Sequence, residues 1–253
     1  MHFKLISYSH IDNSDMNPFK FLKERARLRK ELINNVRELE WAHIFHDSIR
    51  GKEYLEKLPL NIGRWAGNYS FFYILNRILA DYKPKSILDL GLGESSKFIS
   101  TYISNSLLNT KHIIVEQDSE WIASFQNRFT LSSNSMIVHC PLIQKKINGH
   151  NSNSYDGFEN KIKDKFDLYI VDGPFGSDRF SRHDIINLVE NFSSKEEFII
   201  IMDDTNRQGE RDTLEEIKNL LSKKGIKFFV GVYSGNKQNT IIATSVYRNS
   251  TTF

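Results

Sequence analysis

The stretch Ser86–Ser96 constrains the fold of this 253-residue chain more than any other part of its sequence. An apolar run typical of a buried strand carries Asp89 near its end and leads into a tight turn that contains Gly91 and Gly93. A helix is expected directly afterwards, over residues 97–104. Strand, glycine turn and helix are the first half of a βαβ unit, the building block of parallel sheets.

A second apolar run, residues 112–115, follows this helix and ends in Glu116. In nucleotide-type sites, glycines let the backbone approach the ligand, and a carboxylate at this strand end accepts hydrogen bonds from ribose hydroxyls. Ser95 and Ser96 stand where dinucleotide-binding proteins have their third glycine. Loss of that glycine favours S-adenosylmethionine, which has a ribose and an amino-acid tail but no pyrophosphate. The residues expected to bind this cofactor are Asp89, Gly91, Gly93, Ser95 and Glu116, with Asp89 at the methionine amino group.

Composition and charge are those of an ordinary soluble globular protein. The 34 basic and 31 acidic residues are mixed along the chain, and their net charge of +3 predicts no nucleic-acid partner and no attraction to anionic membranes. A single cysteine, Cys140, excludes an internal disulfide and a cysteine metal cluster. We expect no membrane span and a cytoplasmic location, because the chain shows neither a transmembrane-length run nor a secretion signal. The sequence leaves the oligomeric state open, homo-oligomers included.

Apolar runs and helical segments alternate along the second half of the chain, which predicts an α/β fold with a mostly parallel, seven-stranded sheet. The expected strands are residues 86–90, 112–116, 136–139, 166–171, 198–202, 227–233 and 240–246. The expected helices between them are residues 97–104, 119–129, 183–191 and 212–223. Only residues 234–239 separate the last two strands, too few for a crossover helix, so these strands must form an antiparallel hairpin. The predicted fold is therefore Rossmann-like.

Two further segments are expected outside this sheet. Residues 1–62 are predicted to form an N-terminal helical extension to the domain of residues 63–253, because apolar residues recur there at helical spacing, at Leu28, Leu32, Val36 and Leu39. Residues 144–165 are rich in Asn, Ser, Lys and Asp, which predicts a flexible insertion. We expect both segments to cover the acceptor substrate.

Carboxylates follow the fourth and fifth strands. Asp172 ends one strand, and Asp203 and Asp204 end the other, so the three should meet where ligands bind an open α/β sheet. Carboxylates gathered in this way repel one another unless positive charge compensates. One candidate is a divalent cation, Mg²⁺ or Mn²⁺, held by these aspartates. Another is a set of arginines in the same loops, Arg179, Arg182 and Arg207, and a third explanation is simple capping of turns.

His183 lies at the expected start of the helix that follows Asp172. A neutral imidazole accepts a proton near pH 7, so His183 and Asp172 are the candidate catalytic residues. The alternative is that His183 is a surface residue.

Four stretches together resemble a known group: residues 91–96, 115–122, 171–176 with Arg182, and 202–207 with Glu210. Their order is similar to that in plant polysaccharide O-methyltransferases that act on glucuronic acid in xylan. The resemblance covers about residues 85–210, and the chain departs from it at Asp89 and in its N-terminal region. Adjacent carboxylates like Asp203 and Asp204 also resemble those of metal-binding sugar O-methyltransferases.

The resemblance implies a class I methyltransferase fold and an S-adenosylmethionine-dependent O-methyltransferase whose acceptor is a small-molecule sugar or glycan hydroxyl. Three other interpretations stay open. The same fold could methylate a small phenol, a protein or RNA. A nicotinamide-dependent oxidoreductase is disfavoured by the missing third glycine and by the terminal hairpin. A non-catalytic scaffold is disfavoured by the glycine turn, Glu116 and the acidic residues.

Overall fold

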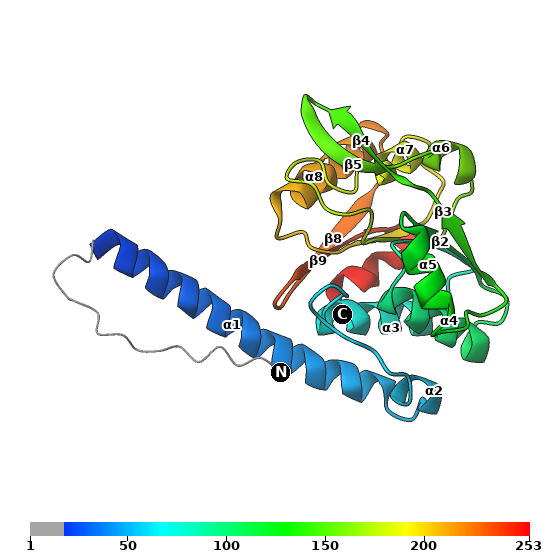
Figure 1. The fold of residues 1–253 in the computed structure, drawn as a ribbon, viewed down its shortest axis with the longest axis horizontal. Coiled ribbons are helices and arrows are strands. Elements are labelled where there is room, and N and C mark those ends of the chain that lie inside the picture. The colour runs from blue at the N-terminus through cyan, green and yellow to red at the C-terminus, as the bar shows by residue number, and fades with distance from the viewer. Residues whose placement is uncertain (1–17) are drawn as a thin grey trace.

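The computed structural model describes residues 18–253, and its centre is a seven-stranded sheet of order β3-β2-β1-β6-β7-β9-β8 (Figure 1). Five strands run parallel: β1 (Ser86–Leu90), β2 (Lys111–Glu116), β3 (Ser135–His139), β6 (Leu168–Val171) and β7 (Ile199–Met202). The last two, β8 (Phe228–Ser234) and β9 (Gln238–Thr244), form an antiparallel hairpin, and β9 pairs with β7. The predicted sheet and its terminal hairpin are therefore confirmed.

Helices cover both faces of the sheet. The helices are α3 (Tyr69–Asp81), α4 (Glu94–Ser106), α5 (Ser119–Gln126), α7 (Asp184–Val189) and α8 (Gln208–Lys223), with a 3-10 helix at Ser245–Thr252. Strand β6 shows how the two faces are built, because alternate side chains point to opposite sides. Leu168 and Ile170 join the core beneath α3 and α4. Tyr169 and Val171 join the core beneath α7 and α8.

Residues 142–161 correct the prediction of a flexible insertion. Strands β4 (Leu142–Ile147) and β5 (His150–Tyr155) form a second, two-stranded antiparallel sheet, followed by the short helix α6 (Phe158–Lys161). Asp184 of α7 holds this hairpin by accepting hydrogen bonds from the Ser154 hydroxyl and from the Tyr155 amide. Tyr155 and Phe158 are buried in the main core. The insertion is therefore an ordered part of the domain.

The N-terminal part of the described chain is the long helix α1 (Pro18–Ile49), followed by α2 (Glu53–Glu56). The second half of α1 packs on the domain through Phe45 and Ile49, while its first half projects away from the domain (Figure 1). The helical part of the predicted extension is thus present, and residues 1–17 lie outside the described residues. Within residues 18–253, no helix combines the length and the apolar character that crossing a membrane requires.

The sheet has one point where the chain changes direction. It passes from β1 outward through β2 to β3 and then returns to β6 on the other side of β1. Open α/β sheets bind ligands at such a point, beyond the carboxyl ends of the strands. The loops after β1 and β6 therefore form the place to examine for function.

Candidate active site

The loops after β1 and β6 touch through their glycines. Gly91 has φ +109°, a value that favours glycine, and its amide donates a hydrogen bond to the Val115 carbonyl of β2. A Cβ on Gly173 would lie 2.2 Å from the Tyr155 hydroxyl and 3.1 Å from the Gly91 backbone. These two turns must therefore pack backbone against backbone, which keeps side chains out of the point where the sheet changes direction.

Asp89 of β1 stabilises this glycine turn. Its carboxylate is fully buried and accepts hydrogen bonds from the hydroxyls of Ser96, at 2.7 Å, and Ser95, at 3.3 Å. His112 of β2 lies on its other side, with Nε2 3.7 Å away. Asp89 thus ties the first turn of α4 to β1. The structure places Asp89 beside the glycine turn, but its oxygens accept hydrogen bonds from Ser95 and Ser96 of the protein itself.

Glu116 lies at the end of β2, next to the glycine turn, and is 6% exposed. Its carboxylate accepts hydrogen bonds from the amides of Leu92 (2.9 Å), Gln117 (2.7 Å) and Asp118 (2.9 Å). Burial raises its pKa, and these backbone hydrogen bonds oppose the rise. A carboxylate has about four acceptor positions, so three amides leave room for a ligand hydroxyl. The predicted cofactor residues thus surround one loop.

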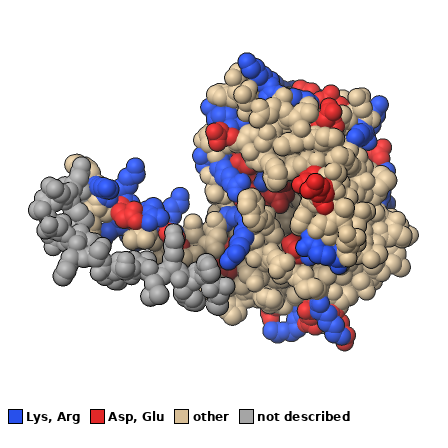
Figure 2. Space-filling view, in the orientation of Figure 1, with Lys and Arg blue, Asp and Glu red and all other residues tan. Residues whose placement is uncertain are grey.

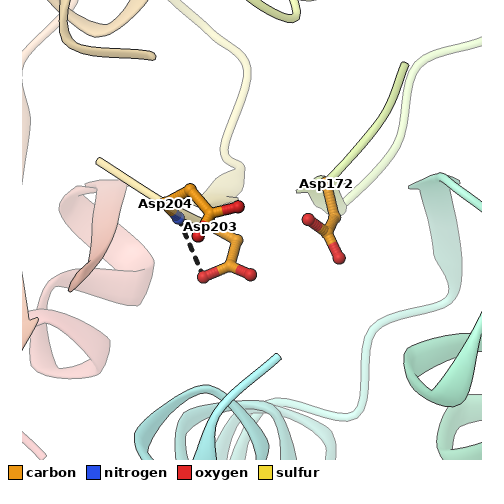
Figure 3. Close-up of side chains that lie close together, drawn as sticks. All are labelled: Asp172, Asp203 and Asp204. Atoms are coloured by element: carbon orange, nitrogen blue, oxygen red, sulfur yellow. Dashed lines mark hydrogen bonds between the residues drawn. The ribbon is translucent and has the colours of Figure 1, made fainter. Parts of the chain in front are cut away.

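The three predicted aspartates come together on the other side of this loop. Asp172 follows β6, Asp203 and Asp204 follow β7, and one oxygen from each lies within 4.8 Å of the others (Figure 3). The Asp204 amide donates a hydrogen bond to Asp203, which fixes the turn after β7. The side chains of Asp203 and Asp204 are 0% and 4% exposed, whereas that of Asp172 is 20% exposed. Asp172 is therefore the carboxylate of this cluster that a substrate can reach.

Two of the three predicted arginines neutralise the aspartates. The buried Arg182 guanidinium places Nη2 3.0 Å from Asp172 and 2.9 Å from Asp204. Arg207 places Nη1 3.2 Å from Asp204. Arg179 instead pairs with Asp212 of α8, outside the cluster.

Lys237 is a third cation, which sequence reasoning missed. It lies in the turn between β8 and β9, and its Nζ is 3.3 Å from Asp203 Oδ2 and 3.5 Å from Asp204 Oδ1. Burial lowers its pKa, but Asp203 and the other carboxylates outweigh burial, so the pKa is raised. A signal was available in the sequence. The sequence predicted a hairpin of β8 and β9. The turn of such a hairpin can lie at the edge of the sheet where the parallel strands have their carboxyl ends.

The cluster has one more carboxylate than cations. Glu210 of α8 is buried, lies 3.8 Å from Arg182 Nε, and leaves its own Oε2 without a hydrogen-bond partner. With every group ionised, four carboxylates face three cations, a net charge of −1. The carboxylates are Asp172, Asp203, Asp204 and Glu210. The site therefore favours a proton or a cationic ligand.

Burial and neighbouring carboxylates both act on Asp172. Burial raises the pKa of Asp172 to about 8, with Arg182 opposing the rise and Asp203 adding to it. Such a carboxyl exchanges its proton near neutral pH.

The structure places His183 apart from the aspartates. His183 is the residue before α7, and its Nε2 lies 2.9 Å from a carboxylate oxygen of Glu216 on α8. Its catalytic role stays a prediction.

No protein-family model and no curated protein matches this sequence. Solved structures match its fold. An O-methyltransferase from Bacillus cereus, in complex with S-adenosylhomocysteine, is 10% identical, with a TM-score of 0.50 over 80% of this chain and 91% of that chain. A Podospora anserina methyltransferase bound to S-adenosylhomocysteine is 12% identical, with a TM-score of 0.43 over 91% of this chain and 99% of that one. The chain has the class I methyltransferase fold. The fold expected from the sequence is thus confirmed.

The raised pKa of Asp172 predicts how stability changes with pH. Its folded pKa exceeds the unfolded value of about 3.9, so its contribution to stability is complete below the unfolded value and is lost as pH rises through the folded value. Wild-type protein should therefore lose more stability than Asp172→Asn between about pH 5 and about pH 8. Urea unfolding of both proteins across this range measures the difference. Parallel pH profiles would contradict the raised pKa.

Proposed function

We propose that this protein is an S-adenosylmethionine-dependent O-methyltransferase. The observation that carries the proposal is the position of Glu116 beside the glycine turn in a class I methyltransferase fold, with the aspartate cluster across the same loop. The similar Bacillus cereus protein has S-adenosylhomocysteine bound. When bound, S-adenosylmethionine supplies the methyl group for in-line transfer to an acceptor oxygen.

The residues of the chain fit this cofactor. Glu116 keeps an acceptor position for a ribose hydroxyl, and Gly91 and Gly93 leave the backbone open to close approach. When Asp172 is ionised, the cluster beyond β6 and β7 has a net negative charge, which suits the positive sulfonium of the methyl donor. Asp89 contributes by holding Ser95 and Ser96.

Asp172 is the group we assign to the acceptor hydroxyl. It is the least buried aspartate of the cluster, and its raised pKa makes its ionised form a better proton acceptor than an ordinary aspartate. A polar site of carboxylates and basic groups suits an acceptor with several hydroxyls, which supports the sugar or glycan implied by the sequence resemblance. Arg182 would hold Asp172 in place while it accepts the proton.

The predicted divalent cation fits the cluster poorly. The three aspartates have the oxygen atoms that Mg²⁺ or Mn²⁺ prefers. However, Arg182 bridges Asp172 and Asp204, and the Lys237 ammonium lies between Asp203 and Asp204. An ion would have to displace these cations. We therefore propose that the two basic side chains, rather than a metal, compensate the aspartates.

Titration calorimetry with S-adenosylhomocysteine tests cofactor binding. Glu116→Gln should weaken affinity about 10-fold or more, because a charge-assisted hydrogen bond contributes about 1.5–3 kcal/mol. Glu120→Gln is the control, since Glu120 is an exposed carboxylate in the first turn of the next helix, α5. Tight binding of NAD with none of S-adenosylhomocysteine would point to the oxidoreductase instead.

Methyl transfer to oligosaccharides that carry glucuronic acid tests the acceptor. Asp172→Asn should lower kcat about 10²- to 10⁴-fold, the range for general-base catalysis, while affinity for S-adenosylhomocysteine changes little. Asp178→Asn, an exposed aspartate in the same loop, should remain active. Methyl transfer to a phenol, a peptide or RNA but not to the glycan would show that the proposed acceptor class is wrong. Full turnover by Asp172→Asn would remove its catalytic role.

Titration with Mn²⁺ tests how the charge of the aspartates is compensated, and this binding measurement needs no acceptor. Wild-type protein should bind no Mn²⁺, and EDTA should not alter its methyl transfer. Lys237→Met should gain Mn²⁺ binding because it vacates the position between Asp203 and Asp204, and Lys237→Arg should not. Lys218→Met is the control, because Lys218 pairs with Glu215 on the surface of α8. Stoichiometric Mn²⁺ binding by the wild type, or loss of transfer in EDTA, would restore the metal site.

A further inference from the structure

Helix α1 carries an unusual share of the exposed apolar side chains. Of the eighteen large apolar side chains exposed among the described residues, nine lie on this helix. Its first half projects from the domain (Figure 1), and Lys and Arg side chains gather on this projecting part (Figure 2). Exposed apolar surface of this extent marks an interaction site.

Four of these side chains form a narrow stripe. Phe21, Leu28, Leu32 and Leu39 are 43%, 52%, 64% and 65% exposed. At 100° per residue, they lie within about 40° of one another around the helix axis. Phe45 and Ile49, which pack on the domain, lie roughly 120° and 80° away around the axis. The stripe is thus a separate face, which leaves the contact with the domain intact.

The spacing of the stripe is symmetric. Its steps are seven, four and seven residues, so the pattern reads the same from either end and is centred on residue 30. When two copies of a helix pair antiparallel about a two-fold axis, each residue meets the one equally far on the other side of the centre. Phe21 then meets Leu39 of the second copy, and Leu28 meets its Leu32. A second copy of α1 therefore fits this stripe along its whole length.

Charge along α1 selects the direction of pairing. Residues 18–30 contain six basic residues and one acidic residue, whereas residues 31–49 contain one basic and four acidic residues. The change of sign falls at the centre of the stripe. Antiparallel pairing places the basic half of each helix against the acidic half of the other, with Lys20 opposite Glu40 and Arg29 opposite Glu31. Parallel pairing would place like charges together.

We propose that the protein forms a two-fold dimer through an antiparallel pair of α1 helices. The dimer does not depend on the proposed methyl transfer. Light scattering during size-exclusion chromatography should give about twice the 29.5 kDa of one chain. Raising the salt concentration should weaken the dimer, because its charge pairs are exposed and screened.

Variants of the full-length chain test the stripe. Leu28→Glu combined with Leu32→Glu should weaken dimerisation about 100-fold or more, because both change the centre of the pair. Thermal unfolding should change little, since neither side chain lies in the core. Ile33→Glu is the matched control, because Ile33 is exposed on α1 but lies outside the stripe. A monomeric wild type, or a dimer that survives the double substitution, would overturn the proposal.

Cross-linking tests the direction. After oxidation, a mixture of Phe21→Cys and Leu39→Cys chains should form the mixed disulfide, and Phe21→Cys alone should form none. The native Cys140 is buried and does not interfere. A disulfide between two Phe21→Cys chains would overturn the antiparallel pair. Binding to anionic vesicles by a protein that stays monomeric would assign the stripe to a membrane surface and would also overturn it.

Discussion

The buried guanidinium of Arg182 holds the site together. It donates to the carbonyls of Val171, at 3.3 Å, and Asp203, at 2.8 Å, which joins the end of β6 to the end of β7. The same group bridges Asp172 and Asp204. Burying a charge costs several kcal/mol unless good geometry and further hydrogen bonds offset the loss of hydration. Nη1 and Nη2 of Arg182 find these partners because β6 and β7 end side by side, so the charge of the site depends on the topology of the sheet.

The sequence predicted the sheet well because its signals are local. Each core strand is an apolar run bounded by turn residues, and the short link before β9 required a hairpin. The β4–β5 hairpin was missed because β5 is polar in composition. Its buried serines are held by hydrogen bonds instead, Ser152 to the Phe180 carbonyl and Ser154 to Asp184. Composition alone therefore treats a hydrogen-bonded strand as a loop.

The part of the candidate site that could be predicted from the sequence is the part that lies at the ends of neighbouring strands. The positions of Glu116 and the aspartates follow from the order of strands, whereas the partners of each charge do not. Lys237 lies 34 residues from Asp203 in the sequence, and only the pairing of β9 with β7 brings the two together. His183 was selected from its local sequence alone, but in the folded chain its imidazole pairs with Glu216 of α8. Charge compensation is thus a property of the folded sheet.

The site and the proposed dimer helix share a structural connection. Glu38 of α1 accepts hydrogen bonds from the Asn236 amide, at 2.9 Å, and from the Asn68 side chain, at 2.8 Å. Asn236 precedes Lys237 in the β8–β9 turn, and Trp41 of α1 donates to the Ser234 carbonyl at the end of β8. The position of the ammonium beside Asp203 therefore depends on how α1 lies against the domain. If two copies pair through α1, each copy therefore helps to hold the α1 helix of the other, and that helix positions Lys237.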